Sequence, residues 1–319
     1  MPVINIAYMR ILSNNDFLNK YKNSIKMKKL SRNRNQVEYS YAFPIPDFPL
    51  AVRIEENAGQ IVSHLHENFS ELVIVLSGRA THLVANRKYQ LTGGDIFVIG
   101  ENRMHAYSET ENFCYCNILM DLNTLKLPPG DLPSRPGYQT LFVIDRQDTA
   151  PDRFRNRFRL NLEQLEKASR MAKEIAGLIP VRRFEAIAKF MLLVGFLCDC
   201  CGNEEKTEGA AIPFRLGHIV AKMERHCERD FPIADMCRQS GMSRAVLFRY
   251  FGNCYGMSPL EYLIRLRVNK SMHLLKNTNL SCGEIAQDCG FTDGSYFAMH
   301  FKKLQGVTPT AYRKKWQGK

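Results

Sequence analysis

Three histidines and one glutamate in the first third of the chain have the residue types and spacing of a ligand set. His64 and His66 are two residues apart, Glu71 follows them, and His105 comes after a predicted glycine turn. Residues two apart in a β-strand point to the same face, so His64 and His66 would lie side by side. Imidazoles and carboxylates bind divalent metals, and they also hydrogen-bond hydroxyl groups. The four residues therefore predict either a divalent metal site or a polar pocket.

Strands must position these four residues, because the chain between residues 37 and 125 has the pattern of a β-protein. Short runs such as ELVIVLSG and DIFVIG are rich in β-branched residues, and Gly, Asn and Asp separate the runs. Regular short strands of this kind are typical of a sandwich or a barrel. A barrel would bring the three imidazoles and the carboxylate together in its interior.

The spacing of these residues also resembles a known motif pair. The chain reads G-x4-H-x-H-x4-E-x6-G and then G-D-x9-H, which is similar to the two motifs of the cupin barrel. The resemblance implies a cupin-like β-barrel, in which the same four residues could hold a divalent metal. A barrel with all four ligands could also be a metal enzyme, such as a dioxygenase or an isomerase.

A second pattern lies near the C-terminus, where one short sequence occurs twice. SRAVLFRYFGNCYGMSP begins at residue 243, and DGSYFAMHFKKLQGVTP begins at residue 293. Each copy has a helix-capping residue, apolar residues at helical spacing, and a Gly before a new Ser-Pro or Thr-Pro start. A shorter apolar helix and a glycine turn precede each copy. This is the pattern of a helix-turn-helix, so we expect two units, at about 233–251 and 282–301.

The second helix of such a unit lies in the DNA major groove, so its solvent-facing residues are the candidates for DNA contact. We expect one stripe of each helix to be buried, formed by Val246, Leu247, Tyr250 and Phe251 in the first and by Tyr296, Phe297, His300 and Phe301 in the second. The solvent-facing positions are then Arg244, Ala245, Phe248 and Arg249 in the first helix and Gly294, Ser295, Ala298 and Met299 in the second. Arg249 can make a bidentate contact to guanine, whereas Met299 can offer only apolar contact. Lys302 and Lys303 would contact phosphates.

The net charge of +12 is concentrated at the two ends of the chain. Residues 213–319 hold 17 Lys and Arg against 8 Asp and Glu, and residues 1–36 hold 8 against 1. A basic domain beside a near-neutral one indicates a polyanionic partner such as double-stranded DNA. The apolar runs are too short to span a bilayer, and no signal-peptide pattern is present. We therefore expect a cytoplasmic protein with reduced cysteines and no membrane partner.

The C-terminal region resembles the DNA-binding domain of the AraC/XylS family of bacterial transcription regulators. SPLEYLIRLR, EIAQDCGF and YFAMHFKKLQGVTPTAYRK carry this resemblance. It implies a domain of seven helices with two helix-turn-helix units. HENFSELVIVLSG and GDIFVIGENRMHAYS are also similar to the rhamnose-operon activators of this family. That similarity implies a small-molecule effector in the barrel, and a sugar such as L-rhamnose fits it.

An effector pocket would use the same polar residues as the predicted metal site. The residues expected to line it are His64, His66, Glu71, His105, Tyr107 and Arg53. Sugars carry many hydroxyl groups, so imidazole, carboxylate and phenol groups suit them. In this interpretation no cofactor is required, and a divalent metal is an alternative occupant of the barrel.

These patterns predict a multidomain α and β protein with five segments. They are a basic extension without a fold (1–36), a cupin-like effector-binding barrel (37–130), a Pro- and Gly-rich loop with two helices (131–201), a polar linker (202–212) and an AraC-type DNA-binding domain (213–319). The two helices of the third segment either form a homodimer or only cover the barrel.

The leading hypothesis is a DNA-binding transcription regulator that responds to a small molecule and is not an enzyme. We expect an activator, which would also contact RNA polymerase. One alternative is a metal-dependent cupin enzyme tethered to a DNA-binding domain, and another is a constitutive DNA-binding dimer.

Overall fold

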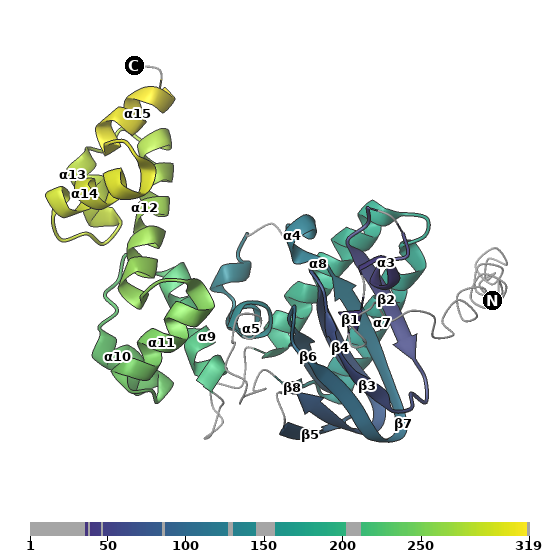
Figure 1. Cartoon of the computed structure of the whole chain (residues 1–319). Helices are drawn as coiled ribbons and strands as arrows, with labels where there is room; N and C mark the ends of the chain where they lie inside the picture. The colour runs from purple at the N-terminus through teal and green to yellow at the C-terminus, as the bar shows by residue number, and fades with distance from the viewer. Residues whose placement is uncertain are drawn as a thin grey trace.

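The computed structural model describes residues 36–37, 39–45, 47–84, 87–126, 130–144, 157–201 and 212–317. Figure 1 shows a β-rich N-terminal part and an all-helical C-terminal part. The predicted fold class of a β-barrel with helices followed by an all-α domain is therefore confirmed. The predicted extension and linker lie outside the described residues, except for the single residues at 36 and 212.

The sheet of the N-terminal part is built around two long antiparallel strands. Its strands are β1 (Gln36–Val37), β2 (Leu50–Glu55), β3 (Ile61–His66), β4 (Ser70–Val84), β5 (Arg87–Thr92), β6 (Asp95–Ile99), β7 (His105–Met120) and β8 (Phe158–Arg159). The order is β1-β3-β7-β4-β6-β8, with β2 paired to β7 and β5 paired to β4. The register of β4 against β7 shifts three times between Val75 and Thr81. Such irregularities bend a strand pair and increase its twist. The bent strands can therefore each pair with two further strands: β4 pairs with β5 and β6, and β7 pairs with β2 and β3.

Alternation along the strands gives the sheet two apolar faces. The outer face includes Leu72 and Ile74 and packs on α7 (Leu162–Leu178) and α8 (Arg183–Cys200). The inner face includes Val73 and Phe97 and forms a separate core inside the barrel. Along each strand, the residues that point into the barrel therefore alternate with the residues that face α7 and α8.

A segment expected to be a loop is helical between residues 132 and 144. It contains η1 (Leu132–Ser134), α5 (Pro136–Tyr138) and η2 (Gln139–Ile144), and two other short helices, α3 (Tyr39–Ala42) and α4 (Leu122–Leu125), precede it. The loop prediction is wrong here because it followed the Pro and Gly residues. The apolar side chains of Leu141, Phe142 and Ile144 are buried, and this burial favours compact helical turns.

The C-terminal part contains seven helices among the described residues, as the family resemblance implies. They are α9 (Ile212–Arg225), α10 (Ile233–Ser240), α11 (Arg244–Tyr255), α12 (Pro259–Asn277), α13 (Cys282–Asp288), α14 (Gly294–Gln305) and α15 (Pro309–Gln317). The long helix α12 runs between the two helix-turn-helix units, as Figure 1 shows. None of the helices that the structure describes is long and apolar enough to cross a membrane.

Glycine makes the turn of each helix-turn-helix unit. Gly241 (φ 65°) follows α10, and Gly290 (φ 84°) follows α13. Both lie in the left-handed region that glycine adopts at little cost. A Cβ at Gly290 would also collide with the main chain of Glu228, so both the backbone conformation and the lack of space favour glycine at this position. The sequence prediction of a glycine turn in both units is confirmed.

Candidate functional site

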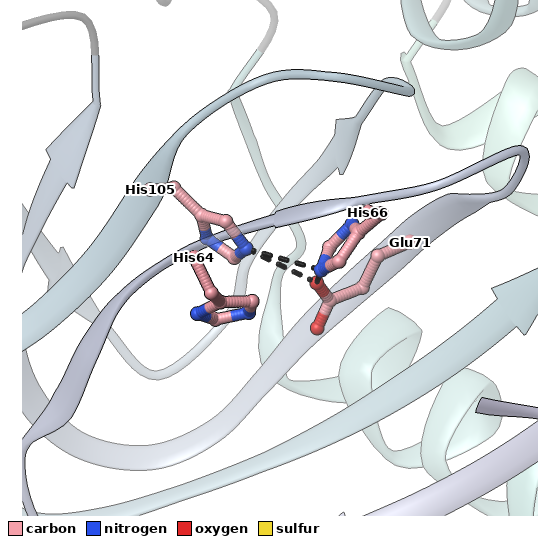
Figure 2. Close-up of side chains that lie close together, drawn as sticks. All are labelled: His64, His66, Glu71 and His105. Atoms are coloured by element: carbon pink, nitrogen blue, oxygen red, sulfur yellow. Dashed lines mark hydrogen bonds and ion pairs between the residues drawn. The ribbon is translucent and has the colours of Figure 1, made fainter. Parts of the chain in front are cut away.

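The structure brings together the four residues predicted as a ligand set. His64 and His66 lie on β3, Glu71 lies near the start of β4, and His105 is the first residue of β7. The β3–β7 register places His64 directly opposite His105. One nitrogen or oxygen from each residue can be chosen so that all four atoms lie within 4.8 Å of one another. Figure 2 shows that the side chains point toward a common centre.

Three of the four donor atoms are close neighbours. Glu71 Oε2 lies 3.1 Å from His66 Nε2 and 3.5 Å from His105 Nε2. The two Nε2 atoms are 3.3 Å apart. His66, Glu71 and His105 are buried, and His64 is half-buried at the edge of the cluster. The cluster is therefore a compact and largely buried polar centre inside the barrel.

Burial disfavours the charged form of two imidazoles of this centre. It lowers the pKa of His105 well below its ordinary value and also lowers the pKa of His64. A further histidine, His82 on β4, is buried beside them, and burial lowers its pKa to about 3. His82 Nε2 lies 3.3 Å from His105 Nδ1. Neutral imidazoles have a lone pair, which is the form that binds a metal or accepts a hydrogen bond.

His82 was not among the residues predicted from the sequence, for a geometric reason. His82 lies eleven residues after Glu71 on β4, and residues an odd number apart point to opposite faces of a regular strand. The register shifts between Val75 and Thr81 break this alternation. No sequence signal indicated these shifts, apart from the glycine at position 78, which has a positive φ.

The two additional pocket residues lie in different places. Tyr107 is buried on the inner face, and its ring stacks on that of His82 at 5.0 Å between centroids. Arg53 on β2 instead donates hydrogen bonds to the main-chain oxygens of Tyr41 and Ala42. Among the described residues, no hydrogen bond or ion pair joins Arg53 to the histidine cluster. The structure thus places Tyr107 beside the predicted site, whereas Arg53 contacts the main chain of α3 instead.

Helix α11 presents the predicted surface of the first unit. Ser243 caps it by accepting a hydrogen bond from the backbone N–H of Val246. Leu247, Tyr250 and Phe251 are buried and Val246 is half-buried, as expected. The predicted DNA-facing residues Arg244, Ala245 and Arg249 are exposed, and Phe248 is half-buried.

Two arginines on this surface differ in their contacts. The guanidinium carbon of Arg244 lies 5.5 Å from the ring centre of Phe248. In the part of the chain that the structure describes, Arg249 forms no ion pair, so its guanidinium group is open to solvent. Arg249 therefore has its donor groups available for a partner.

Helix α14 presents a different surface. Asp293 caps it by accepting hydrogen bonds from the backbone N–H groups of Ser295 and Tyr296. The predicted DNA-facing residues Gly294, Ser295 and Met299 are exposed and Ala298 is half-buried, while Lys302 and Lys303 are both exposed. Met299 is 56% exposed, so it presents an apolar side chain where Arg249 presents a charged one.

The prediction that Tyr296 belongs to the buried stripe of α14 is wrong. Tyr296 is 38% exposed, while Phe297 and Phe301 are buried. Tyr296 lies in the first turn of the helix, where its ring contacts His300 at 4.4 Å between centroids instead of entering the core. Tyr296 is therefore an additional candidate for DNA contact that the periodicity did not indicate.

Comparison with known proteins identifies the two halves of the chain. A family model described as an AraC-like ligand binding domain matches residues 53–178, and one described as a helix-turn-helix domain matches residues 236–315. The chain belongs to the AraC family of transcription regulators. The predicted family and its DNA-binding function are thereby confirmed.

Relatives match this AraC-family chain over most of its length. The HTH-type transcriptional activator RhaR of Enterobacter sp. (strain 638) is 28% identical over 273 residues, covering 81% of this chain and 93% of the relative. The HTH-type transcriptional activator RhaS of Klebsiella pneumoniae (strain 342) is 26% identical, covering 78% and 86%. A solved structure of ToxT from Vibrio cholerae with bound unsaturated fatty acid covers 85% of this chain and 97% of its own, at 16% identity and a TM-score of 0.31.

The ligand-binding domain and the DNA-binding domain of this AraC-family chain contact each other through residues 132–144. Helix α5 packs on both α8 and α9, and η2 packs on α9 (Figure 1). The backbone approach is close, because a Cβ at Gly217 of α9 would lie 2.5 Å from Thr140 Oγ1. The Phe158 ring next to the barrel also meets Phe214 of α9, at 4.3 Å between centroids.

The same segment reaches the first recognition helix. Ile144 is a member of the core of the first helix-turn-helix unit. The Tyr255 hydroxyl at the end of α11 donates to Gln139 Oε1 at 3.0 Å, and Cys254 Sγ donates to the Ile144 carbonyl oxygen at 3.5 Å. A continuous set of contacts therefore leads from α8, which covers the barrel, to the helix that is expected to read DNA.

Proposed function

We propose that the chain is a transcription activator that binds a sugar in its barrel and changes its DNA affinity in response. The main support is the pairing of an AraC-like ligand binding domain with a helix-turn-helix domain in one chain. Relatives over about four fifths of the chain are named transcriptional activators, which favours activation. In this proposal the barrel is a sensor and not an enzyme, and the protein acts in the cytoplasm, where it contacts RNA polymerase at a promoter.

The inner face of the barrel has groups that a sugar could satisfy. The hydroxyl of Tyr107 and Oδ1 of Asn117 are buried, and neither has a hydrogen-bond partner in the part of the chain that the structure describes. Asn117 is opposite Val73, which belongs to the inner core. Buried polar atoms without a partner are uncommon and require an explanation. Hydroxyl groups of a sugar bound beside His64 would provide the missing partners.

The segment 132–144 offers a route for the response. A ligand that binds one arrangement of the two domains more tightly than another shifts the equilibrium between them. Movement of α8 would change the packing of α5 and η2 against α9, and so the position of α11 through Gln139 and Tyr255. We infer that the first helix-turn-helix unit receives the effector signal.

In the same proposal, α11 reads bases and α14 mainly anchors the protein. Arg249 is exposed on α11 and can make two hydrogen bonds to one guanine in the major groove. The corresponding residue of α14 is Met299, which has no polar group to donate. Lys302 and Lys303, exposed in the last turn of α14, would contact phosphates.

We also propose that the chain forms a homodimer through α7 and α8. Helix α8 is apolar on most of its surface, and only one face of it is buried against the barrel. Phe184 and Leu192 on this helix are 84% and 66% exposed. A second copy of the same helix would cover them and would present four helix-turn-helix units to DNA. Equilibrium sedimentation of the wild type beside Leu192→Lys tests this, since the charge should shift the protein toward monomer.

The test of the function is DNA affinity of the full chain, with and without sugars. DNA sites are first selected from random sequences with the purified protein, and Kd is then measured by fluorescence anisotropy at fixed salt, without and with L-rhamnose and a panel of other monosaccharides. We expect one sugar to change Kd by about tenfold, within the range of allosteric coupling. If no sugar binds by calorimetry or changes Kd, the chain is instead a constitutive DNA-binding protein.

A further inference from the structure

We propose that Arg267 is a positioning residue that fixes the second helix-turn-helix unit relative to the first, and so sets the spacing between the two DNA segments that the chain reads. Arg267 lies in the middle of α12, the helix that runs between the two units (Figure 1). The inference rests on the proposed DNA contacts of both α11 and α14. It goes beyond them because it assigns part of the DNA specificity to a side chain inside the protein.

The guanidinium group of Arg267 is buried with little negative charge beside it. The residue is only 8% exposed. Its ion-pair partner among the described residues is Asp230, whose Oδ1 lies 3.9 Å away and whose side chain is 90% exposed. A pair with so exposed a partner at this distance compensates little of the cost of burying a charge. A buried arginine at this place therefore requires another explanation.

The donors of the Arg267 guanidinium group bind the main chain of the loop between α9 and α10. Nε donates to the Cys227 carbonyl oxygen at 2.7 Å, and a terminal nitrogen donates to the Arg229 carbonyl oxygen at 2.9 Å. A planar guanidinium group presents its N–H donors in a fixed geometry, so it fixes the two carbonyl groups relative to α12. One turn further along α12, Lys270 Nζ donates to Glu228 Oε2 at 3.0 Å. Helix α12 thus binds three consecutive residues of this loop.

The loop that Arg267 binds also contacts both helix-turn-helix units. Cys227 is part of the core of the first unit. The main chain of Glu228 lies against the turn of the second unit, since a Cβ added at Gly290 would lie 2.8 Å from Glu228 Cα. The guanidinium carbon of Arg267 lies 5.8 Å from the ring centre of Phe291, which belongs to the core of the second unit. The two units therefore meet at one joint, made of this loop, Arg267 and the turn of the second unit.

A rigid joint restricts the DNA sites that both units can contact at once. In B-DNA each base pair adds about 3.4 Å along the axis and rotates the grooves by about one tenth of a turn. If the two units cannot move relative to each other, a base pair inserted between their segments takes one segment out of register with its recognition helix. If the joint is loose, α14 can follow its segment and the insertion costs less affinity. Arg267 therefore affects which spacing is bound, although its side chain is buried.

The test measures how the DNA affinity of the full chain depends on this spacing. Sites are selected from random DNA with the wild type in the absence of sugar, and one base pair is then inserted at each step across the selected site. Kd is measured by fluorescence anisotropy at fixed salt. For the wild type, we expect an insertion between the two segments to raise Kd at least about tenfold, because base contacts are lost. The ratio of Kd for the inserted and the original site is compared between variants, since a lower folded fraction affects both sites equally.

Three variants assign the effect to the joint. Arg267→Met keeps a long side chain without donors and should lower the ratio to about threefold or less, because α14 can then follow its segment. Lys270→Met removes only the contact with Glu228 and should lower the ratio less, in the same direction. Arg265→Met is the matched control, because Arg265 is exposed on the same helix, and its ratio should equal that of the wild type. Circular dichroism and the melting temperature show whether each variant is folded, and Lys270→Met decides if Arg267→Met is not.

Two results would overturn the inference, and they can be told apart. If the wild type shows the spacing preference and the folded joint variants keep the wild-type ratio, Arg267 does not set the spacing, while the DNA contacts proposed for α11 and α14 stand. If the wild type binds the inserted sites as tightly as the original, the two units do not read segments at a fixed spacing. The DNA contact proposed for α14 then fails as well.

Discussion

The two helix-turn-helix units share one scaffold but differ in what they contact. In both, a glycine turn leads into a helix capped by Ser243 or Asp293. The first unit includes Ile144 of the ligand-binding half in its core, and Tyr255 at the end of its recognition helix bonds to Gln139. The core of the second unit is formed, among the described residues, by α12 to α15 and the chain between them. Only the first unit is therefore in a position to sense the barrel directly.

The exposed side chains of α11 and α14 also differ in their capacity for hydrogen bonds. Arg249 of the first unit has a planar group with several donors, and Met299 of the second has none. We therefore propose that the first unit combines base reading with effector response, while the second contributes affinity. Substitutions in the two units and at the contact between the two halves of the chain test this division.

The largest effect is expected from Arg249→Ala. Loss of a bidentate contact to guanine costs about 1–3 kcal/mol, so affinity for the selected site should fall by about 5- to 150-fold. The loss should be concentrated at one guanine position, which anisotropy titrations with single-base variants of the site can locate. Met299→Ala is the matched control in the second unit and should weaken binding only a few-fold. Equal losses in the two variants would end the distinction between the units.

A second test acts on the contact between the two halves. In Gly217→Ala, the new Cβ would lie 2.5 Å from Thr140 Oγ1, so either the Thr140 side chain must leave its hydrogen bond to the Pro136 carbonyl oxygen or α9 must shift away from η2. We expect the sugar-dependent change in Kd to fall from about tenfold to about twofold or less, with DNA still bound. Gly177→Ala on α7 is the control, because nothing lies within 4 Å of its added Cβ. A full sugar response in Gly217→Ala would show that the signal takes another route.

A smaller effect on the same route is expected from Tyr255→Phe. The substitution removes only the hydroxyl that donates to Gln139, a hydrogen bond worth about 1 kcal/mol. The sugar-dependent ratio of Kd values should therefore change by about fivefold at most, because only the part of this energy that differs between the two states affects the ratio. Tyr312→Phe makes the same chemical change in the core of the second unit and should leave this ratio unaltered. An equal change in both variants would indicate a general loss of stability instead of coupling.

The smallest and most uniform effect is expected from Lys302→Ala. A lysine that contacts a phosphate contributes about one unit to the slope of log K against log salt concentration. We expect Kd to rise by a similar factor for selected and for random DNA, while the slope becomes shallower by about one. Lys276→Ala, on α12 with its ammonium over the Trp316 ring, serves as the control. A loss restricted to the selected sequence would assign Lys302 to base reading.

The sequence was informative wherever structure depends on neighbours along the chain. The caps at Ser243 and Asp293, the glycine turns and the buried stripe of α11 were all predictable, because each depends on residues within one or two helical turns. His64 and His66 share a face for the same local reason, and the cupin-like spacing added Glu71 and His105 to them. The roles of the individual DNA-facing and pocket residues stay predictions.

Only the tertiary structure decided the remaining features. Register shifts between distant strands moved His82 to the inner face, although alternation along β4 predicts the opposite. Burial between two domains turned the expected loop at 132–144 into helical segments that join α8 to α9. Both features depend on contacts between residues far apart in the sequence, and local propensity contains no information about such contacts. Local sequence patterns thus predict the helix-turn-helix scaffold and the cluster of His64, His66, Glu71 and His105. Contacts between distant residues place His82 beside that cluster and connect the two halves of the chain.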